Sequence, residues 1–167
     1  MPIEEKEIEV KEDIPVIAEK IPLTLSSEAF TEGQAIPAVY TCDGTDINPP
    51  LAIPTAPAET KGFALIVDDP DAPAGDWVHW LVWNISPGTN TILTQTVPKG
   101  AVQGKNDFGK TSYGGPCPPS GTHRYMFKLY ALDAKLDLAS GANKAALLKA
   151  MKGHILDQTT LSGTYSR

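Results

Sequence analysis

Residues 63–73 read FALIVDDPDAP, a continuous apolar run that ends at two aspartates and then at a loop rich in proline. A short apolar run closed by turn residues is typical of a strand that is covered on both faces. Pro70 and Pro73 each fix their own φ and restrict the preceding residue, so the loop after the strand is expected to be stiff. The stretch therefore predicts a buried central strand and a rigid loop that presents Asp69 and Asp71.

Residues 77–85, WVHWLVWNI, predict the next strand. Apolar side chains occur at both parities of this segment, so it too is expected to be covered on both faces. Strand alternation places His79 on the same side as Trp77, Leu81 and Trp83. This histidine is therefore expected to point into apolar surroundings.

A third strand is predicted over residues 123–132, where apolar and polar positions alternate. Its inward side is expected to consist of His123, Tyr125, Phe127 and Leu129. The first two of these residues would then lie where the strand begins.

One helix is predicted, over residues 140–156, with Ser140 or Asn143 as its N-terminal cap. Leu148, Met151 and Ile155 recur at the spacing of one helical face, and Gly153 is expected to bend or end the helix. Together with the turn-rich remainder, these elements predict an all-β domain: two packed antiparallel sheets, a β-sandwich, with a short C-terminal helix.

Composition limits the classes of protein. The 167 residues suit one domain, which we place at residues 21–167, after a charged N-terminal extension at residues 1–20. A net charge of −6 provides no overall basic field for nucleic acid, and no apolar stretch is long enough to span a membrane. The N-terminus lacks the apolar core of a secretory signal, so a cytoplasmic location is expected, or export if a signal has been removed.

Two loops carry the candidate site. Asp69 and Asp71 in the first loop either form turns with their own backbone or present carboxylates to a ligand or to His79. The second loop, residues 114–121, reads GGPCPPSG and leads directly into His123 and Tyr125. A carboxylate beside an imidazole favours imidazolium, which would attract an anion, and the glycines would let a ligand approach the backbone closely.

Several motifs resemble the phosphatidylethanolamine-binding protein family, in particular its bacterial and archaeal, Raf kinase inhibitor-like branch. They are DPDAP at 69–73, HW at 79–80, NI at 84–85, GPCPPSGTHRY at 115–125 and FKLYALD at 127–133, with YTCDG at 40–44, NPPL at 48–51, DFGK at 107–110 and GHIL at 153–156. The likeness runs from about residue 30 to residue 167 and leaves out the charged extension.

The resemblance implies a two-sheet sandwich with a small pocket for phosphate-like anions such as lipid or nucleotide head groups. By motif position the pocket would be formed by Asp69, Asp71, His79, Gly115, Pro119, His123 and Tyr125. It also brings Cys42 near Cys117, so a disulfide is an alternative to two free thiols in a reducing compartment.

Three function classes follow. We favour a binding protein for small phosphorylated ligands, with no cofactor and no catalysis. The second class is a regulator of a protein partner, since some relatives are described as inhibitors of kinases or serine proteases. The third is a hydrolase or metal-dependent enzyme that uses the aspartates and histidines. A homodimer is left open, and the bond between Ala72 and Pro73 is a candidate cis peptide.

Overall fold

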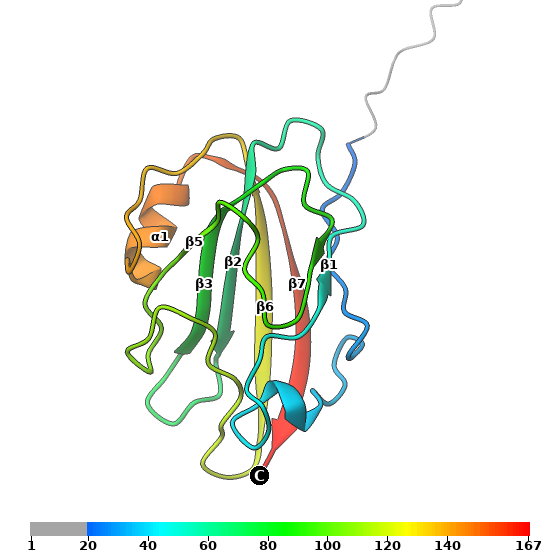
Figure 1. The fold of residues 1–167 in the computed structure, drawn as a ribbon, viewed down its shortest axis with the longest axis vertical. Coiled ribbons are helices and arrows are strands. Elements are labelled where there is room, and N and C mark those ends of the chain that lie inside the picture. Colours follow the sequence, from blue (N-terminus) through cyan, green and yellow to red (C-terminus); the bar gives the residue numbers. More distant parts are fainter. Residues whose placement is uncertain (1–19) are drawn as a thin grey trace, which may run out of the picture.

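The computed structural model describes residues 20–167, and its main element is a five-stranded antiparallel sheet in the order β5-β3-β2-β6-β7 (Figure 1). The extension at residues 1–20, apart from its last residue, lies outside the described part of the chain. The bounds of the large sheet are β2 (Gly62–Asp69), β3 (Trp77–Ile85), β5 (Val102–Gln103), β6 (Thr122–Leu132) and β7 (Ile155–Ser166).

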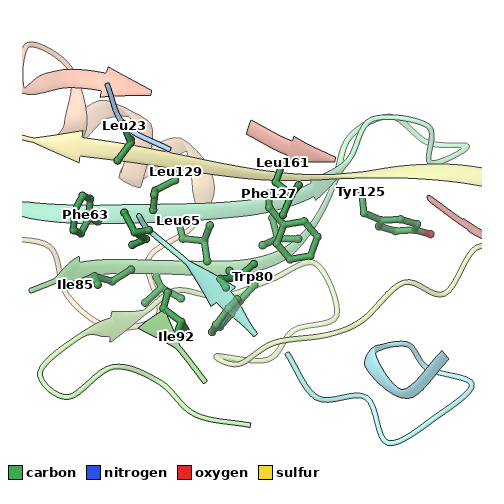
Figure 2. Close-up of a cluster of buried hydrophobic side chains, with 14 of the residues drawn as sticks. Leu23, Phe63, Leu65, Trp80, Ile85, Ile92, Tyr125, Phe127, Leu129 and Leu161 are labelled. Atoms are coloured by element: carbon green, nitrogen blue, oxygen red, sulfur yellow. The ribbon is translucent and has the colours of Figure 1, made fainter. Parts of the chain in front are cut away.

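A second, smaller antiparallel sheet pairs β1 (Leu51–Ala52) with β4 (Thr91–Ile92), and an isolated bridge joins Ser26 to Ala52. Its buried side chains, Leu51 and Ile92, pack on one face of the large sheet, and Figure 2 shows Ile92 in the main core with Phe63, Phe127 and Leu129. The predicted all-β fold with two antiparallel sheets and a short helix is confirmed. The small sheet contributes few strand residues, and long loops supply the rest of that layer.

The central strands are buried as their apolar sequences predict. Every residue of β2 is buried, and so is every residue of β3 except Trp77 and Asn84, which are half-buried. In β6 the predicted inward residues are all buried, because their side chains point toward the main core. The residues that alternate with them point to the other face and are half-buried or exposed.

The helix is shorter than predicted. α1 spans Lys144–Met151, and the side chain of Asn143, one of the two expected caps, accepts a hydrogen bond from the N–H of Ala146. Its buried side chains are Leu147 and Met151, which cover the other face of the large sheet, whereas Leu148 is exposed. The predicted helical face of Leu148, Met151 and Ile155 therefore does not form the buried side of the helix.

The C-terminal part of the predicted helix is a strand instead. Gly153 adopts a φ of +83°, a conformation that ends a helix, and Ile155 begins β7. β7 pairs with β6 along all 11 residues of the latter. Long-range pairing thus replaces the helical turn that the spacing of Met151 and Ile155 suggested.

Two further findings bear on the predictions. No helix within residues 20–167 has the length and hydropathy needed to cross a membrane. The described peptide bonds include no cis bond, so the prediction of a cis bond between Ala72 and Pro73 was wrong. The loop is closed by a turn in which the N–H of Gly75 donates to the carbonyl of Ala72, and the bond before Pro73 is trans.

Candidate functional site

Antiparallel pairing brings four strand ends together at one edge of the large sheet. β2 and β7 end there and β3 and β6 begin there, at the lower edge in Figure 1. The loops at this edge enclose a cavity of about 210 Å³. Its lining consists of Asp69, Ala72, Pro73, Trp77, His79, Phe108, Cys117, Pro118, Pro119, His123 and Tyr125.

His79 reaches the cavity because of a β-bulge. Val67 pairs with Trp80 and the next residue, Asp68, pairs with Val78, which leaves His79 as an extra residue in β3. A bulge turns the extra side chain away from simple alternation. His79 therefore faces Tyr125, with ring centroids 5.2 Å apart, while Leu81 and Trp83 pack on the opposite face of the sheet. The expectation that His79 shares a side with those two residues was wrong.

The hydrogen bonding of His79 fixes which ring nitrogen is available. Its Nδ1 lies 2.7 Å from the carbonyl oxygen of Gly114, and because a carbonyl can only accept, Nδ1 carries the proton. Burial lowers the pKa of His79, and this effect exceeds the opposing influence of the Gly114 carbonyl and of Asp69. The resting imidazole is thus neutral at neutral pH, with Nε2 left for a ligand.

His123 is held by Asp69, as a carboxylate–imidazole pair. The Nδ1 of His123 lies 2.6 Å from Oδ2 of Asp69, and both side chains are nearly inaccessible to solvent. The other carboxylate oxygen of Asp69 accepts a hydrogen bond from the N–H of Asp71 at 2.8 Å. Asp69 is therefore fully engaged, and Nε2 is again the imidazole nitrogen that a ligand can use.

Tyr125 contributes a hydroxyl that has no hydrogen-bond partner among the described residues, although the residue is only 1% exposed. Burial, followed by the negative charges of Asp69 and Asp71, raises its pKa well above the usual value. The hydroxyl is therefore a permanent donor near neutral pH. A buried donor without a partner is costly, so an acceptor is expected there when the site is filled.

Two of the predicted pocket residues do not line the cavity. The carboxylate of Asp71 turns toward β6 and forms a two-pronged ion pair with Arg124, with both N–O distances 2.9 Å. Hydrogen bonds from the side chain and backbone of Arg124 lower the pKa of Asp71 to about 2. Gly115 is buried against Tyr40 and donates its N–H to Asp46 at 2.7 Å, so its backbone is already occupied. Both residues therefore hold the two loops in place through contacts outside the cavity.

The second loop is tied down by a disulfide between Cys42 and Cys117, whose Cα atoms are 5.4 Å apart. The N–H of Cys42 also donates to the carbonyl of Pro116 at 3.1 Å. Cys117 and Pro119 lie on the cavity side of this loop, in keeping with the predicted position of Pro119. Of the two alternatives for the cysteines, the structure has the disulfide.

Sequence reasoning missed Phe108 as a cavity residue, and it placed Trp77 on a strand without assigning it to the site. Phe108 lies in a turn between β5 and β6, and its ring packs on Trp77 and His79 at centroid distances of 5.5 and 5.4 Å. The signal available in the sequence was the motif at residues 107–110, which the resemblance included without a role. Within residues 20–167 no three His, Cys, Asp or Glu side chains form a group that could hold a metal ion.

Comparisons with known proteins agree with this architecture. The family model described as phosphatidylethanolamine-binding protein matches residues 26–166. A UPF0098 protein from Methanothermobacter thermautotrophicus is 50% identical over 151 residues, which cover 87% of this chain and 99% of that protein. A UPF0098 protein from Chlamydia muridarum is 46% identical, with coverages of 87% and 99%.

Two solved structures share the fold. A homolog of phosphatidylethanolamine-binding protein from Chlamydia trachomatis has a TM-score of 0.83 and 42% identity. YbcL from E. coli, described as a member of the mammalian PEBP family, has a TM-score of 0.80 and 31% identity. Each comparison covers 87% of this chain and 98% of the other. The chain belongs to the phosphatidylethanolamine-binding protein family.

Proposed function

We propose that this protein binds small phosphate-bearing anions in the cavity at the edge of the large sheet and does not transform them. The observation that carries the proposal is the buried hydroxyl of Tyr125, which lacks a partner among the described residues. It lines the same cavity as two imidazoles whose Nδ1 atoms are already used, by Gly114 and by Asp69.

The charges at the site connect binding to protonation. Among residues 20–167 no lysine or arginine lines the cavity, and the one carboxylate that does, Asp69, is paired with His123. A phosphate monoester carries −1.5 to −2 charges near pH 7. Because His79 is neutral at that pH, the anion gains an N–H donor from an imidazole Nε2 only when the ring is protonated. Affinity is therefore expected to fall as pH rises.

The absence of catalysis is part of the proposal. Cys117, which lies at the cavity, is in a disulfide and is not available as a thiolate. The cavity lining given above also contains no serine, threonine or lysine. Incubation with an aryl phosphate, followed by phosphorus NMR, should show no release of phosphate beyond the uncatalysed rate. Turnover that His123→Ala abolishes would contradict this part of the proposal.

Calorimetry with inorganic phosphate tests the binding. We expect weaker binding at pH 8 than at pH 6, and loss of most binding in His123→Ala. His154→Ala is the matched control, because His154 pairs with Asp133 at 2.8 Å much as His123 pairs with Asp69 but lies outside the cavity. Binding that is independent of pH, or equally weakened by the two substitutions, would refute the proposal.

The compartment is a separate question. Disulfides persist mainly in oxidising compartments, although intracellular proteins of hyperthermophiles also carry them. The bond between Cys42 and Cys117 thus supports export over a reducing cytoplasm. Fractionation of the source cells, with the protein trapped by alkylation before lysis, would decide between them: reduced cysteines in a cytosolic fraction would exclude export.

A further inference from the structure

The deep and the outer parts of the cavity differ chemically. The polar lining residues are all buried, with exposed fractions of 7% or less: Asp69, His79, His123 and Tyr125. The residues that are half-buried or exposed carry apolar groups, and these form the mouth of the cavity: Ala72, Pro73, Trp77, Phe108, Cys117 and Pro119. A ligand that fills this cavity meets donors at the bottom and apolar surface at the mouth.

Phe108 is the largest exposed apolar group at the mouth. Its exposed fraction is 41%, whereas the other described phenylalanines are at most 5% exposed. Exposed aromatic surface that borders a cavity gains free energy when a ligand covers it. The other half of the ring is already packed, edge to face, against Trp77 and His79.

A tight turn holds Phe108 in place. The side chain of Asn106, which is 3% exposed, accepts hydrogen bonds from the N–H groups of Phe108 and Lys110, both at 3.0 Å. The same side chain donates to the carbonyls of His79 and Ser112. The exposed ring is therefore fixed relative to His79 before any ligand arrives, which reduces the entropy lost on binding.

The ring also rests on the backbone that positions the imidazole. A Cβ atom at Gly114 would lie 2.6 Å from the ring of Phe108, so the ring needs a glycine beneath it. The carbonyl of that glycine is the one that accepts the hydrogen bond from His79 Nδ1. Phe108, Gly114 and His79 thus form one continuous unit that runs from the mouth of the cavity to its polar end.

We infer that the ligand is a phosphate ester with a small uncharged, apolar substituent, and that Phe108 determines the affinity for that substituent. This inference rests on the proposed phosphate-binding function. The phosphate would occupy the polar end, and the substituent would lie against Phe108 and Trp77. The volume of about 210 Å³ is below the roughly 300–1,000 Å³ of pockets for drug-sized ligands, so only the head and the adjoining group fit inside.

The charges at the mouth argue against a cationic substituent. Asp69 is the one carboxylate among the lining residues, and its oxygens are taken by His123 and by the N–H of Asp71. The nearby carboxylate of Asp71 is paired with Arg124. An ammonium group at the mouth would therefore find no free carboxylate among the described lining residues.

Calorimetry with three probes tests the inference: inorganic phosphate, phenyl phosphate and phosphoethanolamine. The wild-type protein should bind phenyl phosphate at least tenfold more tightly than inorganic phosphate. Phe108→Ala should weaken the binding of phenyl phosphate at least fivefold more than it weakens the binding of inorganic phosphate. Phe108→Leu, which keeps an apolar group, should retain most of the affinity for phenyl phosphate. Leu148→Ala is the matched control, because Leu148 is 42% exposed on α1 and lies outside the cavity.

The outcomes separate this inference from the proposed function. If inorganic phosphate and phenyl phosphate bind equally well, the inference is overturned while phosphate binding stands. Tighter binding of phosphoethanolamine than of phenyl phosphate would overturn it in favour of a charged substituent. A loss of both phosphate and ester binding in Phe108→Ala would show that the ring supports His79 and does not select the substituent. If no probe binds the wild-type protein, the proposed function and the inference both fail.

Discussion

The disulfide between Cys42 and Cys117 should contribute more to stability than any other single link in the described chain. It closes a loop with a sequence separation of 75 residues. The loss of chain entropy in the unfolded state corresponds to about 4.5 kcal/mol at 25 °C for a loop of this length. Engineered bonds often deliver less, typically about 2–4 kcal/mol, so the expected loss lies between about 2 and 4.5 kcal/mol.

The perturbation is the double substitution Cys42→Ser and Cys117→Ser. The hydrogen bonds that join the same two segments do not involve sulfur: Cys42 N–H donates to Pro116, and Gly115 N–H donates to Asp46. The native arrangement can therefore persist without the bond, and the main effect should be on the unfolded state. For a chain of this size the loss corresponds to a fall in Tm of about 5–15 °C.

Urea unfolding at pH 7 measures the effect. The oxidised wild-type protein should be the most stable, and its m-value should be smaller than that of the variant because the crosslink keeps the unfolded state compact. Wild-type protein with a thiol reductant should match the double-serine variant, and reductant should not change the variant. If the oxidised wild type and the variant unfold within about 0.5 kcal/mol of each other, the entropic reasoning is refuted.

Three further predictions concern the site and its support. Tyr125→Phe should weaken phosphate binding about tenfold or more in calorimetry without lowering Tm, because the hydroxyl has no hydrogen-bond partner among the described residues. Since burial lowers the pKa of His79 from 6.5, the unfolded state binds more protons below that pH. Stability should therefore fall as pH drops below about 6.5, and urea midpoints at pH 7.5 and 5.0 should differ less in His79→Gln than in the wild type; equal differences would contradict the assignment. Asp68→Asn should cost about 2–4 kcal/mol in urea unfolding, because it leaves Lys128 and Lys144 without their fully buried partner. A variant as stable as the wild type would show that Lys128 and Lys144 do not need the charge of Asp68, since Lys144 also pairs with Asp76.

The sequence predicted the central strands well for a local reason. β2 and β3 are covered on both faces, so their apolar runs are long, and a proline follows soon after each strand, at Pro70 and Pro87. β7 was missed because most of its residues are small or polar, such as Thr159, Thr160 and Ser162. Its conformation is determined by pairing with β6, and a pattern read along one segment contains no information on that partner.

The sequence predicted which residues lie near the candidate site more reliably than it predicted where each side chain points. Five of the seven predicted residues line the cavity, and Asp71 and Gly115 do not. Asp71 turns away because Arg124 offers both its side chain and its backbone N–H. The direction of His79 depends on a bulge, which becomes visible only when β2 is aligned beside β3.

The rigidity of the loop after β2 has a different origin from the one that its prolines suggested. With the bond before Pro73 in the trans form, the two ends of the loop are held by ion pairs. Asp71 pairs with Arg124 on β6, and Asp76 pairs with Lys144 at the start of α1.

The two carboxylates at the end of β2, just before this loop, are also paired. Asp68 and Asp69 are adjacent on β2, so their side chains point to opposite faces. Asp69 is paired with His123 at the cavity, and Asp68 is paired with Lys128 and Lys144 beneath α1. Each of the two buried carboxylates is thus paired on its own face of the sheet, and Asp69 is not free to contact a ligand in the cavity.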